Sequence, residues 1–507
     1  MSIRLRLRLE PLECRTVPTA GYYRIADYNI ASSMSSPATG LDTILQGIGN
    51  EHLNGVTQPI DLLALEEVQS QATTSAAVTT LLNNLYGAGI YAHGTLDGGS
   101  SGSGTQGIVY NQQKLQLVSE AGIGTVSTSG QPRQALRYKL HPVGYASTAD
   151  FYVYVSHYKA NNDTTDEGRR LTEATAIRAD ADQLGQGVQI LYIGDYNMYF
   201  SAETGYQKLL SSGNGQAFDP VNRPGNWHGT ASFVDIDSQA PAVNPPNGLT
   251  GGGLDDRFDF QLQTGELNDG QGFEYVSGTY HSFGNNGTVA LGGNINDASN
   301  TALADLSNRT TILNLLTTVT DHLPVVADYK VIVPPSVTGV QIGDGTVQRS
   351  RISQLKVVFD QVISYAGAPA AAYSLQKIVG GNPAGNVGFN VSTATVGSHS
   401  ESTITFTSDT TFGSLNDGRY RLTVLANQVL VGSTPMTANS VTDFFRMFGD
   451  ANGDARVDIA DFGLFSTSYG LHSGQSGYLS YFDYNGDGTI DIVDFGQFSL
   501  RMFTMLP

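Results

Sequence analysis

The chain has 507 residues, of which 40% are hydrophobic and 9% aromatic, enough to fill more than one ordinary core. Its formal net charge of −19 excludes the broad basic surface that tight nucleic-acid binding requires. The single cysteine, Cys14, excludes a disulfide within the chain, and no apolar run reaches the roughly 18 residues that span a membrane. We therefore expect several folded domains, in which a phosphate substrate is attracted by a few local cations or by bound metal.

Residues 1–20 differ in pattern from the rest of the chain. They alternate arginine with apolar residues in MSIRLRLRLEPLECR and lack the continuous apolar stretch of a signal peptide. The segment resembles the RLxLExLExR leader of many planctomycete exported proteins, which implies an extracellular or cell-surface location. The alternative is a disordered or strand-like N-terminus.

Residues 21–331 alternate short β-rich apolar runs with helix-like stretches. The runs include YYRIADYNI, PIDLLALEEV, DFYVYVSHY, VQILYIGDYN and LPVVADYK. The clearest helix is DEGRRLTEATAIRADADQLGQ, which has acids early and apolar residues at a helical period from Leu171 to Leu184. Strands interleaved with helices predict a layered α/β domain.

A second domain is predicted at residues 335–445, after a linker at Pro334-Pro335. This part has no helix signal and several alternating runs, such as QLKVVFDQVI and RYRLTVLA, separated by turn residues. Strands at this spacing predict an immunoglobulin-like β-sandwich. Nothing in it points to chemistry, so a spacer or binding module is the favoured interpretation.

Residues 446–507 contain an internal repeat at an offset of 33 residues, with Asp450 corresponding to Asp483. In each copy, oxygen-bearing residues stand at loop positions 1, 3, 5, 9 and 12, and position 7 offers its backbone carbonyl, which is the spacing that surrounds Ca²⁺. The ligands are Asp450, Asn452, Asp454, Arg456, Asp458 and Asp461, then Asp483, Asn485, Asp487, Thr489, Asp491 and Asp494. An acidic solvated turn is the alternative, but two aligned copies favour two calcium sites.

Two loop-then-helix repeats of this kind resemble a type I dockerin, a small α-helical calcium-loop domain. The loops depart from an ordinary EF-hand, because position 12 is aspartate and position 6 of the first loop is Ala455. In dockerins, loop positions 10 and 11 face a cohesin partner, and here they are Ile459-Ala460 and Ile492-Val493. The resemblance implies a cohesin-like partner and an extracellular setting. Packing of these residues between the two helices is the alternative.

Carboxylates, amides and imidazoles stand at the ends of several apolar strands in the first domain. A strand-end histidine alone is more often structural than catalytic. Together, in the order N-I, LEEV, GDYN and DHLPV, these motifs resemble the endonuclease/exonuclease/phosphatase, or deoxyribonuclease-like, superfamily over residues 21–331. The resemblance implies an α/β four-layer sandwich, in which two packed, mostly antiparallel sheets are flanked by helices.

The resemblance also implies a catalytic metal site. Glu67, the second acid of LEEV, matches the family's metal ligand, and Asn29 and Asp321 match the positions that complete the site for Mg²⁺ or Mn²⁺. Glu66 is then a structural or solvent-facing neighbour.

Further residues match the positions that act on the phosphodiester. Asp195 would orient or deprotonate the attacking water, and Asn197 would donate its amide to the phosphate. Asp259 with His322 would form an oriented imidazole. His157 would contact the phosphate or serve the leaving group. In place of the acid that usually orients this histidine, the stretch DGGSSGSGTQGIVYN offers only Asp97, far upstream of GIVYN.

These features predict a secreted or surface-attached, metal-dependent phosphodiesterase, most simply an endonuclease or exonuclease acting on DNA or RNA. Arg170 and Trp227 are possible substrate contacts, with a structural ion pair and a core anchor as the alternatives. The alternative functions are a phospholipid or sphingomyelin phosphodiesterase or another phosphatase of the same fold, and a non-catalytic binding or adhesion protein.

Overall fold

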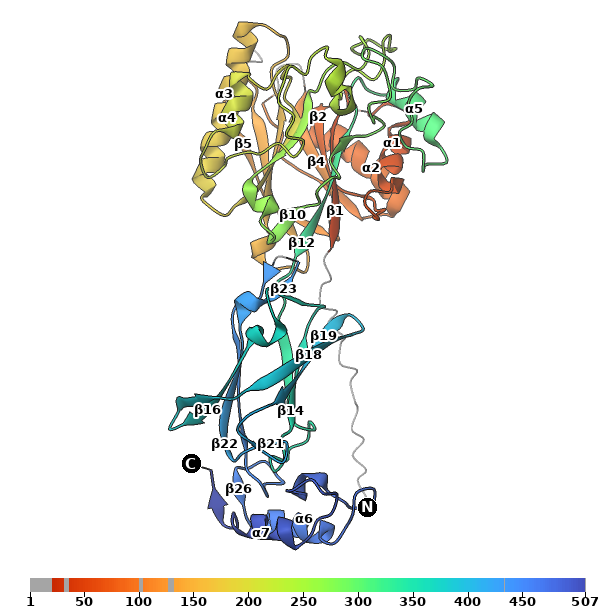
Figure 1. Cartoon of the computed structure of the whole chain (residues 1–507). Coiled ribbons are helices and arrows are strands. Elements are labelled where there is room, and N and C mark those ends of the chain that lie inside the picture. Colours follow the sequence, from red (N-terminus) through yellow and green to blue (C-terminus); the bar gives the residue numbers. More distant parts are fainter. Residues whose placement is uncertain (1–20, 32–35, 100–103, 126–131, 433, 507) are drawn as a thin grey trace, which may run out of the picture. The chain divides into compact units, whose positions relative to one another are not determined.

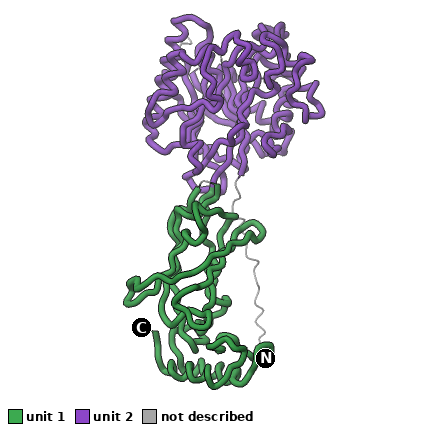
Figure 2. Tube along the Cα trace, viewed as in Figure 1, with its two compact units in different colours: residues 1–19, 333–507 green, residues 20–332 purple. Residues whose placement is uncertain are grey.

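The computed structural model describes residues 21–31, 36–99, 104–125, 132–432 and 434–506. The chain forms two compact units, one at residues 20–332 and one that contains residues 333–507 (Figure 2). The predicted leader, with Cys14, lies outside the described residues. No helix in the described part of the chain is long and apolar enough to cross a membrane.

Two β-sheets form the centre of the unit at residues 20–332 (Figure 1). The first has seven strands in the order β10-β12-β1-β2-β4-β3, with β11 beside β12, and the second has the order β5-β6-β7-β8-β9. The strands of the first sheet are β1 (Tyr22–Asn29), β2 (Ile60–Val68), β3 (Tyr91–His93), β4 (Thr105–Asn111), β10 (Gly272–Tyr275), β11 (His281–Ser282) and β12 (Val325–Ile332). The strands of the second are β5 (Leu115–Ile123), β6 (Ala135–Pro142), β7 (Phe151–His157), β8 (Gln189–Asp195) and β9 (Asp259–Gln263). Only the β1–β2 and β7–β8 pairs of the described strands in this unit are parallel, so the mostly antiparallel character expected from the sequence is confirmed.

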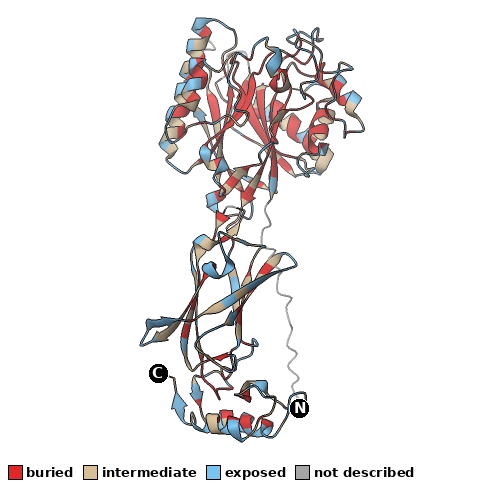
Figure 3. Ribbon diagram, viewed as in Figure 1, coloured by how far each residue is buried: buried red, intermediate tan, exposed pale blue. Residues whose placement is uncertain are grey.

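Helices cover the outer face of each sheet. Those packed on the first sheet are α1 (Leu41–Asn50), α2 (Ala76–Tyr86) and α5 (Arg309–Leu316), and those on the second are α3 (Thr164–Leu184) and α4 (Thr204–Leu210). The α3 helix begins at Asp163, whose side chain accepts hydrogen bonds from the amides of Thr165 and Asp166, and it buries Ala174 and Ile177 against the second sheet. Figure 3 shows the sheet strands buried between these helices. The result is a helix–sheet–sheet–helix arrangement, as the family resemblance implies.

The other unit contains a β-sandwich made of two four-stranded antiparallel sheets. Their strands are β13 (Val337–Ile342), β14 (Gln354–Phe359), β18 (Phe389–Val396) and β19 (His399–Phe406), then β16 (Tyr373–Val379), β17 (Asn382–Asn386), β22 (Gly418–Val424) and β25 (Ser440–Arg446). Shorter strands are β15 (Ser364–Tyr365), β20 (Thr410–Thr411), β21 (Ser414–Leu415), β23 (Val429–Val431) and β24 (Thr434–Pro435). Both sheets contribute to one core, which includes Leu355, Leu375 and Leu422, so this part of the chain has its own hydrophobic interior.

The C-terminal residues form two short helices, α6 (Ile459–Ser468) and α7 (Ile492–Ser499), and a small pair of strands, β26 (Arg456–Val457) and β27 (Thr504–Met505). Phe465, Phe482 and Phe498 form their shared core. Each helix starts with a capping box, in which Asp458 or Asp491 is the N-cap and Asp461 or Asp494 bonds back to it. The same aspartates are thus helix caps and predicted calcium ligands.

Candidate active site

Strand pairing brings the predicted residues of both sheets to one edge of the unit at residues 20–332. In the first sheet, Asn29 ends β1 directly beside Glu66 of the parallel strand β2. In the second, Asp195 at the end of β8 lies between His157 of β7 and Asp259 of β9. Ligand and catalytic sites in α/β sheets lie outside the carboxyl ends of parallel strands, which is where this edge lies.

The GDYN turn has a specific local geometry. Gly194 has φ of 139°, and a Cβ added there would lie 1.9 Å from the carbonyl oxygen of Ser156, so β7 and β8 approach too closely for any other residue. The next residue, Asp195, accepts a hydrogen bond through Oδ1 from the amide of Asn197 at 3.0 Å. Asn197 has φ of 48°, a left-handed conformation that asparagine tolerates, and its side-chain amide donates to the Tyr158 carbonyl oxygen at 3.1 Å. One carboxylate oxygen of Asp195 therefore builds the turn and the other is left for chemistry.

The substitution Gly194→Ala should test this close approach. We expect a loss of about 2–4 kcal/mol in the free energy of unfolding, because the new Cβ meets backbone atoms and the positive φ is strained. Urea unfolding measures it. Gly168→Ala is the matched control, because Gly168 lies in α3 with nothing within 4 Å of its Cβ position, and it should be neutral or slightly stabilising. Equal losses in the two variants would contradict the argument.

The free oxygen of Asp195, Oδ2, lies at the centre of the site. It accepts a hydrogen bond from Asn29 Nδ2 at 3.2 Å and lies 3.5 Å from His157 Nε2 and 3.8 Å from His322 Nε2. Burial raises the pKa of Asp195 to about 7, against the lowering effect of His322. A carboxylate with a pKa near neutrality is suited to take a proton from water.

His322 is held by the acid that the sequence assigns to it. Its Nδ1 lies 2.8 Å from Asp259 Oδ2, and both side chains are buried. Burial alone would lower the pKa of His322, but the carboxylate of Asp259, followed by those of Asp195 and Asp321, raises it well above the usual value. The raised pKa favours the imidazolium form, whose Nε2 lies 3.8 Å from Asp195 Oδ2. His322 Nε2 also lies 2.6 Å from Gln239 Nε2, so the imidazolium requires the Gln239 amide to turn its oxygen toward the ring.

His157 has a different environment. Burial, followed by the positive charge of Arg133, lowers the pKa of His157 well below its usual value. Arg133 donates to the backbone carbonyl of Tyr158 at 2.6 Å and to that of His157 at 3.4 Å. A neutral imidazole can donate a hydrogen bond to a phosphate oxygen, but it is a poor proton donor to a leaving group, so the leaving-group alternative is not supported. Arg133 lies in a loop and carried no sequence signal.

Glu67 reaches the site through a backbone irregularity in β2. Its φ is 59°, and the pairing of β2 with β4 shifts register between Leu65 and Val68, as in a β-bulge. The bulge directs Glu67 toward the same side as Glu66, so that Glu67 Oε1 lies 3.5 Å from Asn29 Nδ2. Gly104 packs directly on this bulge, where a Cβ would lie 2.7 Å from the Val68 carbonyl oxygen. The side chain of Glu67 is 31% exposed, which leaves it accessible to an ion from solvent.

The residues predicted to hold Mg²⁺ or Mn²⁺ fit a hard cation. Burial raises the pKa of Glu67, and the nearby carboxylate of Asp321 adds to the rise, so the two acids lie within reach of each other's charge. Asp321 Oδ2 also accepts from the amide of Thr250 at 2.8 Å. Mg²⁺ binds oxygen and keeps several waters, so one or two carboxylates with the amide oxygen of Asn29 suffice.

A buried carboxyl pair lies beside the predicted metal site and was not anticipated. Asp27 precedes Asn29 by two residues on β1 and shares its face, and Glu66 lies in register with Asn29. Both acids are fully buried, and apart from each other they have no hydrogen-bond partner among the described residues. Burial raises the pKa of both well above normal, with the charge of Asp259 adding for Asp27 and that of Asp27 adding for Glu66. Glu66 is thus structural, and its solvent-facing interpretation is wrong.

Arg170 and Trp227 are buried away from solvent. Arg170 forms an ion pair with Glu203, both side chains being 0% exposed, and donates to the carbonyl oxygens of Lys159 and Asn161 at 2.8 Å each. Trp227 is also 0% exposed, donates to the Arg223 carbonyl oxygen at 3.0 Å and packs in the core beneath α3 and α4. The predicted substrate contacts are therefore contradicted, and the structural alternatives hold for both residues.

The two C-terminal loops share one hydrogen-bond pattern. In the first, Asp450 accepts from the amides of Gly453 at 2.6 Å and Ala455 at 2.9 Å, and in the second, Asp483 accepts from Gly486 at 2.7 Å and Gly488 at 2.9 Å. Ala455 adopts a φ of 66°, the left-handed conformation for which EF-hands use glycine at this position. Burial raises the pKa of Asp450 despite these two bonds. The loops therefore hold carboxylates close together and partly out of water, and a bound cation would offset the resulting electrostatic repulsion and loss of hydration.

An apolar surface accompanies these loops. Ile459 is 69%, Ile492 66% and Val493 50% exposed, which contradicts their packing between the helices. Beside Ile492, a groove of about 320 Å³ between α6 and α7 is lined by Phe462, Phe465, Ser466, Tyr469, Ile492 and Phe495.

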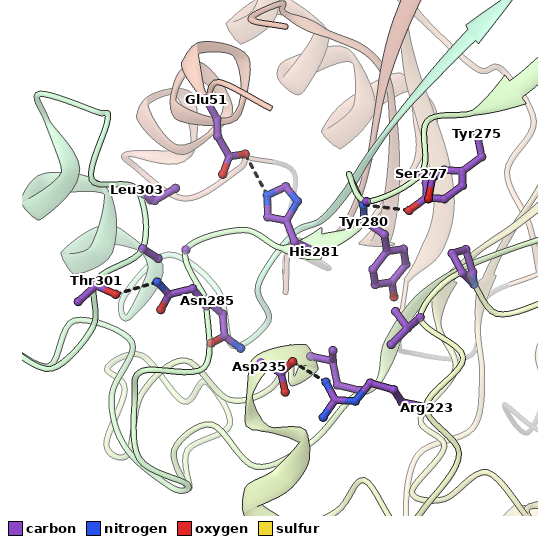
Figure 4. A pocket seen from close by; sticks show the side chains of 17 residues that line it. Glu51, Arg223, Asp235, Tyr275, Ser277, Tyr280, His281, Asn285, Thr301 and Leu303 are labelled. Atoms are coloured by element: carbon purple, nitrogen blue, oxygen red, sulfur yellow. Dashed lines mark hydrogen bonds and ion pairs between the residues drawn. The ribbon is translucent and has the colours of Figure 1, made fainter. Parts of the chain in front are cut away.

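A separate cavity of about 700 Å³ lies in the unit at residues 20–332. Figure 4 shows Glu51 paired with His281 on one side of it and Arg223 paired with Asp235 on another. Both nitrogens of His281 face acceptors, since Nδ1 lies 2.8 Å from the Thr279 carbonyl oxygen and Nε2 2.9 Å from Glu51 Oε2. The ring therefore carries both protons.

The stability of this pair should depend on pH. Burial opposes the charge on His281, but Glu51 raises its pKa above the usual value. The contribution is then fully present below about pH 6.5 and is lost as the pH rises through the raised pKa. We expect His281→Gln to lower the free energy of unfolding by about 1–2 kcal/mol at pH 5.5 and by much less at pH 9. Urea unfolding at both pH values measures it, and equal losses would contradict the assignment.

Comparison with known proteins gives similarity in structure. No family model and no curated protein matches the chain. The human Nocturnin catalytic domain with bound sulfate is 16% identical with a TM-score of 0.37, and the match covers 61% of this chain and 94% of that one. An endonuclease/exonuclease/phosphatase from Bacteroides vulgatus is 13% identical with a TM-score of 0.37, and the match covers 61% of this chain and 99% of that one. D. rerio TDP2 complexed with single-strand DNA product is 13% identical with a TM-score of 0.34, and the match covers 61% of this chain and 98% of that one. At these identities and TM-scores the matches carry no argument about the site, so the chemistry is inferred from this chain's own residues.

Proposed function

We propose that the unit at residues 20–332 is a metal-dependent phosphodiesterase, and specifically a nuclease. The observation that carries the proposal is the position of Asp195 Oδ2, a buried carboxylate oxygen with Asn29 and two imidazoles within 4 Å: the distances are 3.2, 3.5 and 3.8 Å. One imidazole is biased toward the charged form by Asp259 and the other toward the neutral form. A proton acceptor beside a cationic and a neutral hydrogen-bond donor is the set that hydrolysis of a phosphodiester needs.

The residues divide the reaction among them. Asp195 Oδ2 takes the proton of the attacking water, whose oxygen bonds to phosphorus while the bond from phosphorus to the leaving oxygen breaks. Asp195 is kept in place by the Asn197 turn. His322, with Asp259 behind it, donates from Nε2 to a non-bridging phosphate oxygen as negative charge develops there. Neutral His157 donates a further hydrogen bond. Glu67, Asn29 and Asp321 would hold Mg²⁺ or Mn²⁺, which when bound neutralises charge on the phosphate and the leaving oxygen.

Nucleic acid is the proposed substrate class. A net charge of −19 disfavours tight, sequence-specific binding and suits weak, salt-sensitive binding that depends on metal. Outside the arginine-rich residues 1–20, the sequence offers no basic stripe or aromatic hairpin for a lipid surface. Endonuclease or exonuclease action on DNA or RNA is thus favoured over a sphingomyelin-type activity.

A substrate panel tests the proposal. The full-length protein is incubated with Mg²⁺ and plasmid DNA, single-stranded RNA, sphingomyelin vesicles or bis-p-nitrophenyl phosphate. Cleavage of DNA or RNA that EDTA abolishes is the expected result. Cleavage of sphingomyelin alone would replace the nuclease proposal with the lipid alternative, and no cleavage of any substrate would support a non-catalytic binding protein.

We further propose that residues 446–507 are a dockerin-like, calcium-binding attachment module of an extracellular or surface-displayed protein. The matching hydrogen-bond patterns of the two loops support two Ca²⁺ sites. Exposed Ile459, Ile492 and Val493 lie where dockerins meet a cohesin, and an apolar patch beside polar loops suits such a partner.

A further inference from the structure

A cluster of possible metal ligands lies outside the predicted Mg²⁺ site. His228, Asp255 and Asp256 each offer one ligand atom, and these atoms all lie within 4.8 Å of one another. It is the one group of three or more histidine, cysteine or acidic side chains with this geometry in the described part of the chain. His228 Nδ1 lies 2.7 Å from Asp256 Oδ1.

The backbone holds the three residues in place. The amides of Asp255 and Asp256 donate to the Gln239 carbonyl oxygen at 3.1 and 2.9 Å, and the Gln239 amide donates to the Asp256 carbonyl oxygen at 3.0 Å. The amide of Gly229, next to His228, donates to the Asp255 carbonyl oxygen at 2.8 Å. The ligand atoms are therefore brought together by paired backbone segments, so little ordering is needed when an ion binds.

Asp237 is an independent sign of missing positive charge. Its side chain is fully buried, and neither carboxylate oxygen has a hydrogen-bond partner among the described residues. Burial, followed by the charges of Asp256, Asp255 and Asp235, raises the pKa of Asp237 to about 8, so Asp237 lies within reach of the charges of two acids of the cluster. The positive charge of Arg257 lowers the pKa of Asp237, but this effect is smaller than each of the others. A buried acid beside further acids keeps its proton at neutral pH unless a nearby cation lowers its pKa.

A second histidine–aspartate pair shows what a purely structural pair looks like. His141 Nδ1 lies 2.6 Å from Asp150 Oδ1, and Lys139 Nζ lies 2.8 Å from the other oxygen of Asp150. That lysine neutralises the acid. Within the described residues, no lysine or arginine forms an ion pair with Asp255 or Asp256, so the cluster at His228 lacks the cation that the other pair has.

We propose that His228, Asp255 and Asp256 form a second divalent-cation site, which binds a zinc-type transition metal. An imidazole with two carboxylates suits Zn²⁺, whereas Ca²⁺ and Mg²⁺ prefer oxygen ligands alone. Three protein ligands leave one position open, and the His228 side chain is 47% exposed, so water or a ligand oxygen from solvent completes the coordination. Asp237 adds a buried carboxyl without a hydrogen-bond partner among the described residues, within reach of the charges of Asp255 and Asp256. The site adjoins the catalytic centre through Gln239, whose side chain contacts His322.

Cobalt titration of the full-length protein tests the proposal. The protein, prepared without a polyhistidine tag, is stripped of metal, saturated with Ca²⁺ and Mg²⁺, and titrated with Co²⁺ while visible absorption is recorded. We expect one equivalent of Co²⁺ to bind and to be displaced by Zn²⁺. Glu67→Gln should leave this binding unchanged, because the site is separate from the catalytic metal site.

Three variants decide the ligands. His228→Ala and Asp255→Asn should each weaken Co²⁺ binding at least tenfold, and His141→Ala, the matched control, should not change it. Asp255→Asn keeps the side-chain shape, so it decides the result if His228→Ala does not fold, as judged by circular dichroism. Absence of Co²⁺ binding in the wild type, or binding that survives both substitutions, would overturn the proposal.

Discussion

Replacing Asp195 by asparagine is expected to lower kcat for phosphodiester cleavage by about 10²–10⁴-fold, with little change in KM. Asparagine can still accept the Asn197 amide hydrogen bond through its oxygen, so the turn survives. An amide nitrogen then replaces Oδ2, and an amide nitrogen cannot take a proton from water. Initial rates over a range of substrate concentrations, on whichever nucleic acid the wild type cleaves, measure both constants.

The matched control is Asp163→Asn. Like Asp195, Asp163 accepts hydrogen bonds from backbone amides that follow it in the sequence, here the amides of Thr165 and Asp166 at the start of α3. Unlike Asp195, it is exposed and lies outside the site. It should keep full activity. An Asp195→Asn enzyme with wild-type kcat would show that Asp195 is not the proton acceptor.

Removal of calcium is expected to unfold residues 446–507 and leave the unit at residues 20–332 folded. Asp450, Asp461 and Asp494 are fully buried acids in the loops, and an ion is needed to balance them. At free Ca²⁺ one hundred times the Kd, each occupied loop would add about 2.7 kcal/mol to the stability of this module. Calorimetry with and without EGTA should show one transition moving to lower temperature.

Two features of the chain make this result specific. The single tryptophan, Trp227, is buried in the unit at residues 20–332, so its fluorescence should not change when calcium is removed. Asp461→Ala should lower the stoichiometry of calcium binding, whereas Asp344→Ala, in an exposed turn of the sandwich where Asp344 accepts from Thr346, should not. Calcium binding unaffected by Asp461→Ala would contradict the loop assignment.

Local pattern was sufficient for the elements and for much of the site. The strand runs, α3 and the two calcium-loop helices follow from apolar periodicity and capping aspartates, which act between residues close in sequence. The strand-end positions of Asn29, His157 and Asp195 also follow, because parallel strands bring their carboxyl ends to one edge. The pair formed by Asp259 and His322, 2.8 Å apart, matches the pairing that the family resemblance implies.

Other properties depend on contacts between distant parts of the chain. Arg170 and Trp227 are buried, so neither can contact a substrate. The sequence near a motif does not indicate whether a cationic or aromatic side chain will be buried or exposed. His157 is neutral because it is buried near Arg133, which comes from a separate loop. The sequence does contain a signal for the buried acid Asp27, because it stands in an apolar strand two residues before Asn29 and therefore shares its face.

The sequence by itself determined the layered α/β and β-rich organisation, the 33-residue loop-and-helix repeat and the identity of the strand-end acids and histidines, since these depend on short-range periodicity and spacing. The tertiary structure decided which of those groups surround the Oδ2 atom of Asp195, which acid lies on a bulge open to solvent, and which are buried in the core. It also brought His228 to Asp255 and Asp256. Charge states and ligand sets arise from distances and burial between segments far apart in the chain, and no local pattern encodes those quantities.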